Sequence, residues 1–156
     1  PGGPEIERVA QSGDPMAFNF PQPMLHSSDY DFSFSGLKTA VLYAVQDIGE
    51  INSQTQADIA ASFQHAATEV LIKKITKALE DTGRESIVLA GGVAANKLLR
   101  NKISLLKSKL NVDVLYPPLS HCTDNAAMIA YLGSMKVNEA TFSLASHAKP
   151  RWPLGS

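Results

Sequence analysis

One candidate ligand-binding loop has the sequence Gly91-Gly92-Val93-Ala94-Ala95-Asn96, between an apolar run and a helical pattern. Gly91 and Gly92 let a ligand approach the backbone without interference from a Cβ atom, and their amides can turn toward an anion. Asn96 offers a donor and an acceptor to a ribose or an acyl group, beside the partial positive charge of a helix start. Alternatively, the glycines only make a tight turn and Asn96 only caps the helix.

A second loop, Ser120-His121-Cys122-Thr123-Asp124-Asn125, brings three metal-binding residue types together. Asp124 is a candidate metal ligand, because carboxylates bind hard or borderline divalent ions. The loop lacks the paired ligand spacing of a zinc module, so it does not form a metal site by itself. Alternatively, Asp124 is the N-cap of the next helix. A nucleophilic role for Cys122 is the weakest interpretation, because only His121 could activate the thiol.

Other catalytic signatures are missing. The glycine loop has neither the Walker A ending nor the dinucleotide fingerprint. Neither His-Glu-x-x-His nor Gly-x-Ser-x-Gly occurs, so the sequence does not support a self-sufficient protease. The remaining histidines, His26, His65 and His147, are isolated in the sequence.

Hydrophobic spacing predicts the elements that must hold both loops. It indicates helices over 5–12, 37–45 and 57–79, one from about 96, and one starting at Thr123 or Asp124. Residues 31–35 alternate as in a half-buried strand, whereas 86–90 and 112–116 are typical of strands buried on both faces. The order predicts an α/β fold with a sheet flanked by helices. Both loops follow strands separated by a single crossover, so we expect them to lie close together.

Composition limits the classes of protein that remain. The 156 residues are 44% hydrophobic and 19% charged, which suits one folded domain or half of a two-lobed enzyme. No apolar run approaches the roughly 18 residues of a membrane span. The single cysteine excludes an intrachain disulfide framework and fits a reducing compartment, so we expect a cytoplasmic protein without membrane contact.

Charge is unevenly distributed along the chain. Residues 1–60 carry eight acids and two bases, whereas 61–112 carry nine bases and four acids. The basic stretch could attract phosphate backbones. It lacks interleaved aromatic residues, so its lysines are better explained as the solvated faces of two amphipathic helices. The eight side chains considered are Lys73, Lys74, Lys77, Lys97, Arg100, Lys102, Lys107 and Lys109.

Several segments, in order along the chain, resemble motifs of the TsaD/Gcp family. Residues 89–100 resemble its GGVxxNxxLR motif and 122–130 its CTDNxAMIA motif. Residues 32–39 resemble FSFSGLKT, and the first four residues resemble YPGGP without its tyrosine. Residues 149–154 are similar to the RPRWPL ending of bacterial members.

The resemblance implies a tRNA N6-adenosine threonylcarbamoyltransferase, formerly described as an O-sialoglycoprotein endopeptidase. Such an enzyme moves threonylcarbamoyl from threonylcarbamoyl-AMP to adenosine 37 of tRNAs that read codons beginning with A. The implied fold is one lobe of the two-lobed fold of actin, heat-shock ATPases and sugar kinases, with a mixed sheet. Gly3 and Asn96 would contact the adenylate or an ATP-like nucleotide, with Gly91 and Gly92 near its phosphate. Asp124 would be one ligand of a divalent metal, iron or zinc.

The chain departs from the family pattern in one respect. The family's HxxGH and DDAxGEAFDK segments, which supply two metal-binding histidines and a nucleotide-binding aspartate, do not occur. We therefore expect residues 1–154 to be a C-terminal lobe that needs an N-terminal lobe, with 155–156 as a tail or cloning remnant. The implied partners are tRNA and the other subunits of the transfer complex. Two alternatives stay open: a sugar-kinase or ATPase lobe, and a non-catalytic module that binds partners or tRNA through the basic helices.

Overall fold

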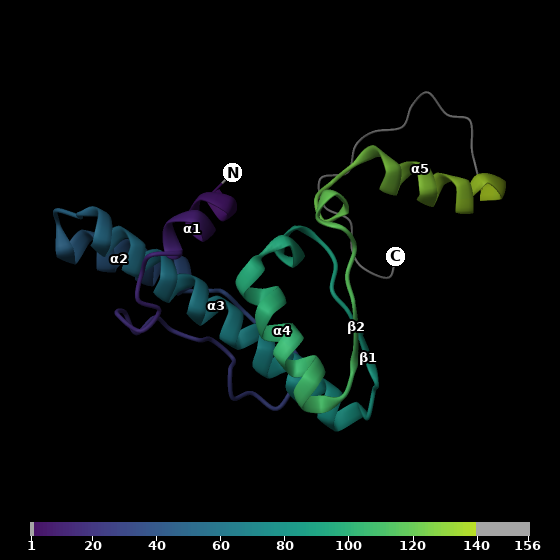
Figure 1. Ribbon diagram of the computed structural model, residues 1–156, viewed down its shortest axis with the longest axis horizontal. Coiled ribbons are helices and arrows are strands. Elements are labelled where there is room, and N and C mark those ends of the chain that lie inside the picture. The colour runs from purple at the N-terminus through teal and green to yellow at the C-terminus, as the bar shows by residue number, and fades with distance from the viewer. Residues whose placement is uncertain (1, 140–156) are drawn as a thin grey trace. The chain divides into compact units, whose positions relative to one another are not determined.

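The computed structural model describes residues 2–139, which form an α/β fold (Figure 1). Pro1, the segment 149–154 and residues 155–156 lie outside the described residues. Contacts divide the chain into two units, Pro1–Thr123 and Asp124–Ser156. In chain order the elements are α1 (Gly2–Ala10), α2 (Leu37–Ile48), α3 (Ser53–Thr82), β1 (Ser86–Val88), η1 (Gly92–Ala95), α4 (Lys97–Leu110), β2 (Asp113–Leu115), η2 (Leu119–His121), α5 (Ala126–Met135) and η3 (Val137–Glu139), where η denotes a 3-10 helix.

Helix α3 organises the first unit. The predicted helix at 57–79 is confirmed and is longer than expected, because Asn52 caps its start and Gly83 ends it. The side chain of Asn52 accepts a hydrogen bond from the Thr55 N–H at 2.8 Å. Gly83 takes the left-handed conformation (φ 61°), and its N–H donates to the Leu79 carbonyl at 3.0 Å, as expected of a C-terminal cap.

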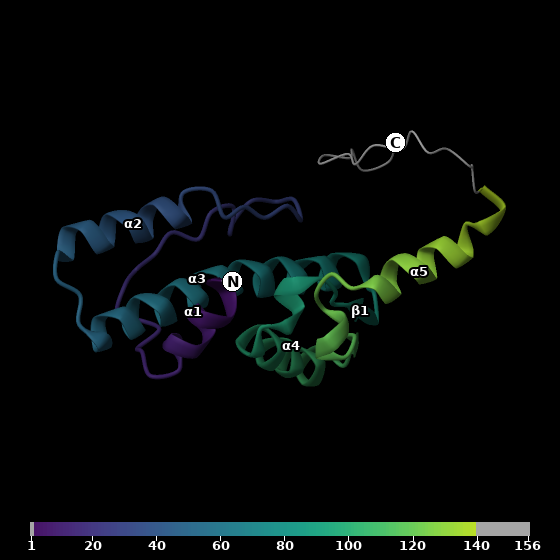
Figure 2. The same ribbon diagram turned by 90° about the horizontal axis from the view of Figure 1, so that it is seen from above.

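Three other helices pack against α3. In Figure 2, α1 and α4 lie on one side of α3, and α2 lies on the other. Helix α1 begins at Gly2 rather than at residue 5, since Pro4 is tolerated in the first turn of a helix. A buried cluster formed by Phe20, Leu37, Ile59 and Ala66 joins α2 and the segment before it to α3.

The turn after α1 lies directly against α3. A Cβ atom on Gly13 would fall 2.0 Å from the Ala57 carbonyl oxygen, so only glycine allows this approach. The Asp14 N–H donates to Asp58 Oδ1 at 2.8 Å, and the Ser62 hydroxyl donates to the Asp14 carbonyl at 3.1 Å. These contacts fix α1 on the helix that carries the cleft described below.

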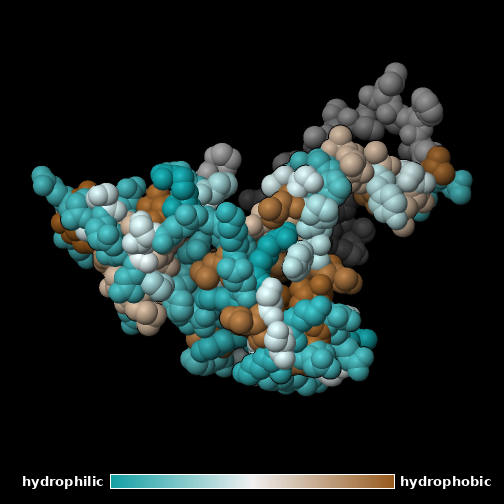
Figure 3. All heavy atoms as spheres, in the orientation of Figure 1, coloured by the Kyte–Doolittle hydropathy of each residue, from teal (hydrophilic) through white to brown (hydrophobic). Residues whose placement is uncertain are grey.

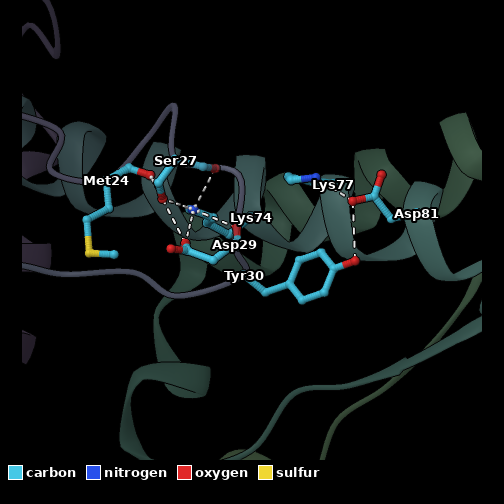
Figure 4. A network of polar contacts seen from close by, with 7 residues as sticks. All are labelled: Met24, Ser27, Asp29, Tyr30, Lys74, Lys77 and Asp81. Carbon is cyan, nitrogen blue, oxygen red and sulfur yellow. Dashed lines mark hydrogen bonds and ion pairs between the residues drawn. The ribbon is translucent and has the colours of Figure 1, made fainter.

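The long segment before α2 is held to α3 by the buried side chain of Lys74, which is 3% exposed (Figure 4). Its ammonium group donates to Ser27 Oγ at 2.6 Å, to the Asp29 carbonyl at 2.8 Å and to Asp29 Oδ1 at 3.1 Å. Hydrogen bonds from Ser27 and then from Lys74 lower the pKa of Asp29. Tyr30 adds a hydrogen bond to Asp81.

The two strands form a parallel pair in which Ile87 lies opposite Val114. The expectation that both faces are buried is wrong: Val88 is 70% exposed and Leu115 is 60% exposed. Figure 3 shows hydrophobic surface near the strands. The expected mixed sheet is likewise absent from the described residues, which contain only this two-stranded parallel sheet.

The predicted strand at 31–35 is also wrong. Within residues 2–139 this segment pairs with no other strand, and Phe32 and Phe34 stay 53% and 43% exposed. Their rings contact each other at a centroid distance of 5.8 Å. Alternation marks the two faces of a strand, but a strand also needs a neighbouring edge for its backbone hydrogen bonds. Gly36, at φ 82°, turns the chain into α2 directly after this segment.

The second unit is described over residues 124–139. It consists of α5 and η3, and the side chain of Asn125 caps α5 by accepting a hydrogen bond from the Met128 N–H at 3.1 Å. Asp124 is therefore not the N-cap, and the helix starts at Ala126, after both predicted starting residues, Thr123 and Asp124. Helix α5 exposes the apolar residues Met128, Ile129, Tyr131, Leu132 and Met135. Nowhere in residues 2–139 is a helix long and apolar enough to cross a lipid bilayer.

Candidate functional site

A cleft of about 500 Å³ opens in the first unit where α1, the start of α2, α3 and η1 meet. Gly3, Gly92 and Asn96, three of the predicted ligand-binding residues, line this cleft together. Gly91 precedes the lining residue Gly92 but does not itself line the cleft. The cleft is lined by Gly3, Pro4, Ile6, Glu7, Phe34, Leu37, Lys38, Phe63, Gln64, Ala67, Thr68, Leu71, Gly92, Val93, Ala95 and Asn96.

The cleft combines an apolar floor with polar groups at its edge. Leu37, Phe63 and Leu71 come from α2 and α3 and supply apolar surface that suits the face of a planar base. Lys38 supplies an ammonium group, and no described residue forms an ion pair with it. Gln64 and Asn96 supply amides. A ligand that has a flat apolar part and a polar or anionic part fits this lining.

Asn96 is the N-cap of α4 and also contacts α3. Its Oδ1 accepts a hydrogen bond from the Leu99 N–H at 2.9 Å, and its Nδ2 donates to Gln64 Oε1 at 3.0 Å. Asn96 therefore does cap α4, but these contacts do not show that it only caps the helix. The Asn96 side chain can still form further hydrogen bonds, because an amide has a second N–H and a second oxygen lone pair.

The glycine loop has the conformation that its composition predicts. Gly91 has φ 84° and ψ 176°, a region that is essentially restricted to glycine. Gly92 then begins η1, in which the Ala94 N–H donates to the Gly91 carbonyl at 3.0 Å. A side chain at position 91 would strain the entrance to η1, and η1 forms one wall of the cleft.

Sequence reasoning missed Glu7 as a residue of this site. The Glu7 carboxylate accepts a hydrogen bond from the Lys97 N–H at 2.7 Å and so occupies part of the N-terminus of α4. Glu7 lies four positions after Gly3, which places both on one face of α1. That spacing was the signal in the sequence, but the distance of 90 positions between the two partners hid the contact.

Arg100 joins the two predicted loops and was also missed as a site residue. Its Nε donates to the Ala94 carbonyl at 2.5 Å, and its Nη2 donates to the Pro117 carbonyl at 3.1 Å. The expectation that the two loops lie close together is confirmed for residues 94 and 117–122 by these contacts and by the approach of Nη2 to Cys122 Sγ at 3.2 Å. Cys122 is only 2% exposed, which argues against a nucleophilic thiol.

Asp124 begins the second unit and is exposed. Within residues 2–139 no group of three or more histidine, cysteine, aspartate or glutamate side chains could hold a metal ion. The described residues therefore do not form a metal site by themselves. Asp124 is at most one ligand of a site whose other ligands lie outside the described residues.

Half of the cations in the basic stretch are paired with acidic residues. Four of its eight predicted cations form ion pairs, namely Lys74 with Asp29, Lys77 with Asp81, Lys102 with Glu69, and Lys107 with Asp113. Partial burial acts to raise the pKa of Glu69, but its hydrogen bond from Lys102 and nearby positive charges make the net shift a lowering. This pairing favours the interpretation of the lysines as helix faces over a continuous phosphate-binding surface.

Comparison with known proteins gives a consistent family. Residues 1–131 match the family model TsaD, described as tRNA N6-adenosine threonylcarbamoyltransferase. A protein of that name from Thermosipho africanus is 58% identical over 133 residues, which cover 85% of this chain and 40% of the relative. The same-named protein of Chromobacterium violaceum is 48% identical over 160 aligned residues, covering all of this chain and 47% of the relative.

The chain thus spans less than half the length of these relatives. The shared region includes the cleft, the loop at 91–96 and the loop at 117–122. On the matched residues and the identity over most of its length, this chain belongs to the TsaD family.

Proposed function

We propose that this chain is the C-terminal half of a tRNA N6-adenosine threonylcarbamoyltransferase, and that its cleft binds the adenylate part of the donor. The single observation that carries the proposal is that Gly3 lines the same cleft as Gly92 and Asn96, although Gly3 is 89 positions before Gly92 in the sequence. The chain would form one lobe of a two-lobed fold like that of actin and the sugar kinases. The other lobe would close the cleft.

Each polar group of the cleft has a role in this proposal. The close backbone approach at Gly3 and Gly92 admits a ribose or phosphate, and the second N–H of Asn96 donates to the adenylate. The first N–H of α4 is bound by Glu7, so a phosphate near Gly91 and Gly92 must use other donors. Lys38, in the same lining, is the side chain that carries the complementary charge.

The reaction depends more on how the donor and the acceptor are positioned than on a nucleophilic residue of this chain. The N6 atom of the tRNA adenosine forms a bond to the carbamoyl carbon and loses a proton, while the bond from that carbon to the phosphate oxygen breaks and AMP leaves with its electron pair. Holding the donor at a fixed position relative to the acceptor makes such a step effectively unimolecular. The residues of the cleft hold and orient the donor, and the tRNA and the partner subunits contact the assembled protein in the cytoplasm.

Within the described residues, no group of three or more histidine, cysteine, aspartate or glutamate side chains could hold a metal ion. The family resemblance assigns one ligand, Asp124, to iron or zinc. The remaining ligands would come from the N-terminal lobe.

The test uses the full-length protein that contains this chain, together with its partner subunits, threonylcarbamoyl-AMP and a tRNA that reads an A-starting codon. Nucleoside mass spectrometry should detect N6-threonylcarbamoyladenosine. The same assay with the isolated 156-residue chain should give no product, because half of the site is missing. No product from the full-length protein would refute the proposed activity, and product from the isolated chain would refute the division of the site between two lobes.

A further inference from the structure

We propose that Arg100 is a positioning residue for the transfer reaction, because its guanidinium group sets the loop at 91–96 against the loop at 117–122. The inference rests on the proposed function, since it assigns Arg100 to the same site. It goes beyond that function in naming a side chain that touches neither donor nor acceptor and acts through the two loops.

The guanidinium group makes three contacts through Nε and Nη2, and one through its face. Nε donates to the Ala94 carbonyl at 2.5 Å, which is at the end of the glycine loop. Nη2 donates to the Pro117 carbonyl at 3.1 Å and lies 3.2 Å from Cys122 Sγ, so it contacts two points along the second loop. The face of the group stacks on the Tyr116 ring, with 4.4 Å between Cζ and the ring centroid.

The contacts of the Arg100 side chain with Ala94, Pro117, Cys122 and Tyr116 are called the clamp below. The charge of Arg100 is used in this clamp rather than in an ion pair. None of the ion pairs formed within residues 2–139 includes Arg100. Two carbonyl oxygens, a buried sulfur atom and an aromatic ring surround the cation instead. A planar fork with several donors can satisfy these partners at once, whereas a lysine ammonium is a compact charge that cannot.

The clamp also connects directly to the cleft. The Arg100 backbone N–H donates to the Asn96 carbonyl at 3.1 Å, so the helix cap and the clamp share one turn of α4. The second loop continues through Thr123 to Asp124. A small displacement between catalytic loops is enough to slow a reaction strongly. Loss of the guanidinium group should therefore reduce turnover while leaving the donor-binding residues in place.

The test compares Arg100→Lys with Arg84→Lys in the full-length protein with its partner subunits. Arg84 is the matched control, because it is exposed and forms no hydrogen bond or ion pair with other residues in the described part of the chain. For Arg100→Lys we expect kcat to fall by about ten-fold or more, with KM for threonylcarbamoyl-AMP changed by less than about three-fold. Arg84→Lys should alter neither value.

A purely structural role predicts a different pattern. In that case the Tm falls, and the kcat of the remaining folded protein equals that of the wild type, which would overturn the inference. In Arg100→Ala, added methylguanidinium should restore part of the lost kcat, and the absence of rescue would also contradict it. If these variants do not fold, Tyr116→Leu is the deciding variant, because it removes only the stacked ring. A lower kcat at an unchanged Tm would support the clamp. An unchanged kcat would overturn it.

The two proposals fail in distinguishable ways. If the wild-type protein does not modify tRNA, the proposed function fails and the role of Arg100 fails with it. If the wild type is active and Arg100→Lys keeps its kcat, only the role of Arg100 is overturned.

Discussion

The carboxylate of Glu7 accepts a hydrogen bond of 2.7 Å from the backbone N–H of Lys97, which links the first and fourth α-helices of the chain. The bond places a negative charge at the positive end of the α4 dipole. It also closes one edge of the cleft, which Glu7 and Asn96 both line. Helix α1 is therefore held to α4 through the same helix terminus that Asn96 caps.

Replacing Glu7 by glutamine tests this link. Glu7→Gln keeps an oxygen acceptor but removes the charge, so the free energy of unfolding should fall by about 0.5–1 kcal/mol. Urea denaturation of the purified chain measures the change. Glu80→Gln is the control, because Glu80 is exposed and has no hydrogen-bond or ion-pair partner among the described residues. An equal effect of both substitutions would show that the negative charge of Glu7 does not strengthen its hydrogen bond with the Lys97 N–H.

Gly13→Ala should disrupt the packing of α1 and the turn after it against α3. The new Cβ would lie 2.0 Å from a backbone oxygen of Ala57, and a helix backbone cannot easily move away. Overpacking of this kind costs about 1–3 kcal/mol of stability. The control is Gly2→Ala, where a Cβ would meet no atom within 4 Å. Thermal unfolding should show a lower Tm for Gly13→Ala only, and an unchanged Tm would mean that the loop shifts freely.

Lys74→Met should loosen the segment before α2. Methionine keeps most of the buried aliphatic stem but leaves the Ser27 hydroxyl and the Asp29 carbonyl without their donor. Loss of such hydrogen bonds at a partly exposed site costs about 0.5–1.5 kcal/mol, which denaturant titration would detect. Its neighbour Lys73 is exposed, so Lys73→Met makes the same substitution without that loss. Equal stability of the two variants would contradict a structural role for the Lys74 network.

The parts of the fold that sequence could predict are those decided by local chemistry. The apolar stripes of α3 and α4 are local patterns, so their spacing predicted both helices, although it placed the start of α3 at residue 57 and missed the cap at Asn52. At the start of α5, Asp124 and Asn125 are both good capping residues, and only the backbone geometry selects Asn125. The alternating segment at 31–35 formed no strand because a strand depends on a partner that local sequence does not specify.

The site was predictable in part for the same reason. Gly92 and Asn96 lie in one loop, and their relation to each other follows from their spacing. The contacts of Glu7 and Arg100 span 90 and 17 positions, and no periodicity encodes such pairs. They depend on how α1 and β2 are placed by packing against α3 and α4.

Asp124→Asn separates metal binding from helix capping, because Asn125 rather than Asp124 caps α5. In the full-length protein we expect Asp124→Asn to leave the Tm unchanged and to lower the metal content measured by elemental analysis, since an amide is a poorer ligand than a carboxylate. Asn125→Ala should do the opposite, with a loss of about 1 kcal/mol of stability and normal metal content. Stoichiometric metal in Asp124→Asn would exclude Asp124 as a ligand.

The most direct test of the cleft as the nucleotide site is a calorimetric titration of full-length Asn96→Asp with an adenine nucleotide, alongside Asn52→Asp. Both asparagines cap a helix by accepting a hydrogen bond, and aspartate caps equally well, so both variants should keep their helix caps. Asn96→Asp also loses the hydrogen bond from Nδ2 to Gln64 Oε1, so its Tm should fall slightly and the titration is done below the unfolding transition. Only Asn96 lines the cleft. Loss of its amide donor should raise Kd by about five- to thirty-fold, equivalent to about 1–2 kcal/mol, whereas Asn52→Asp should bind as the wild type does. An unchanged Kd for Asn96→Asp would contradict the assignment of the nucleotide to this cleft.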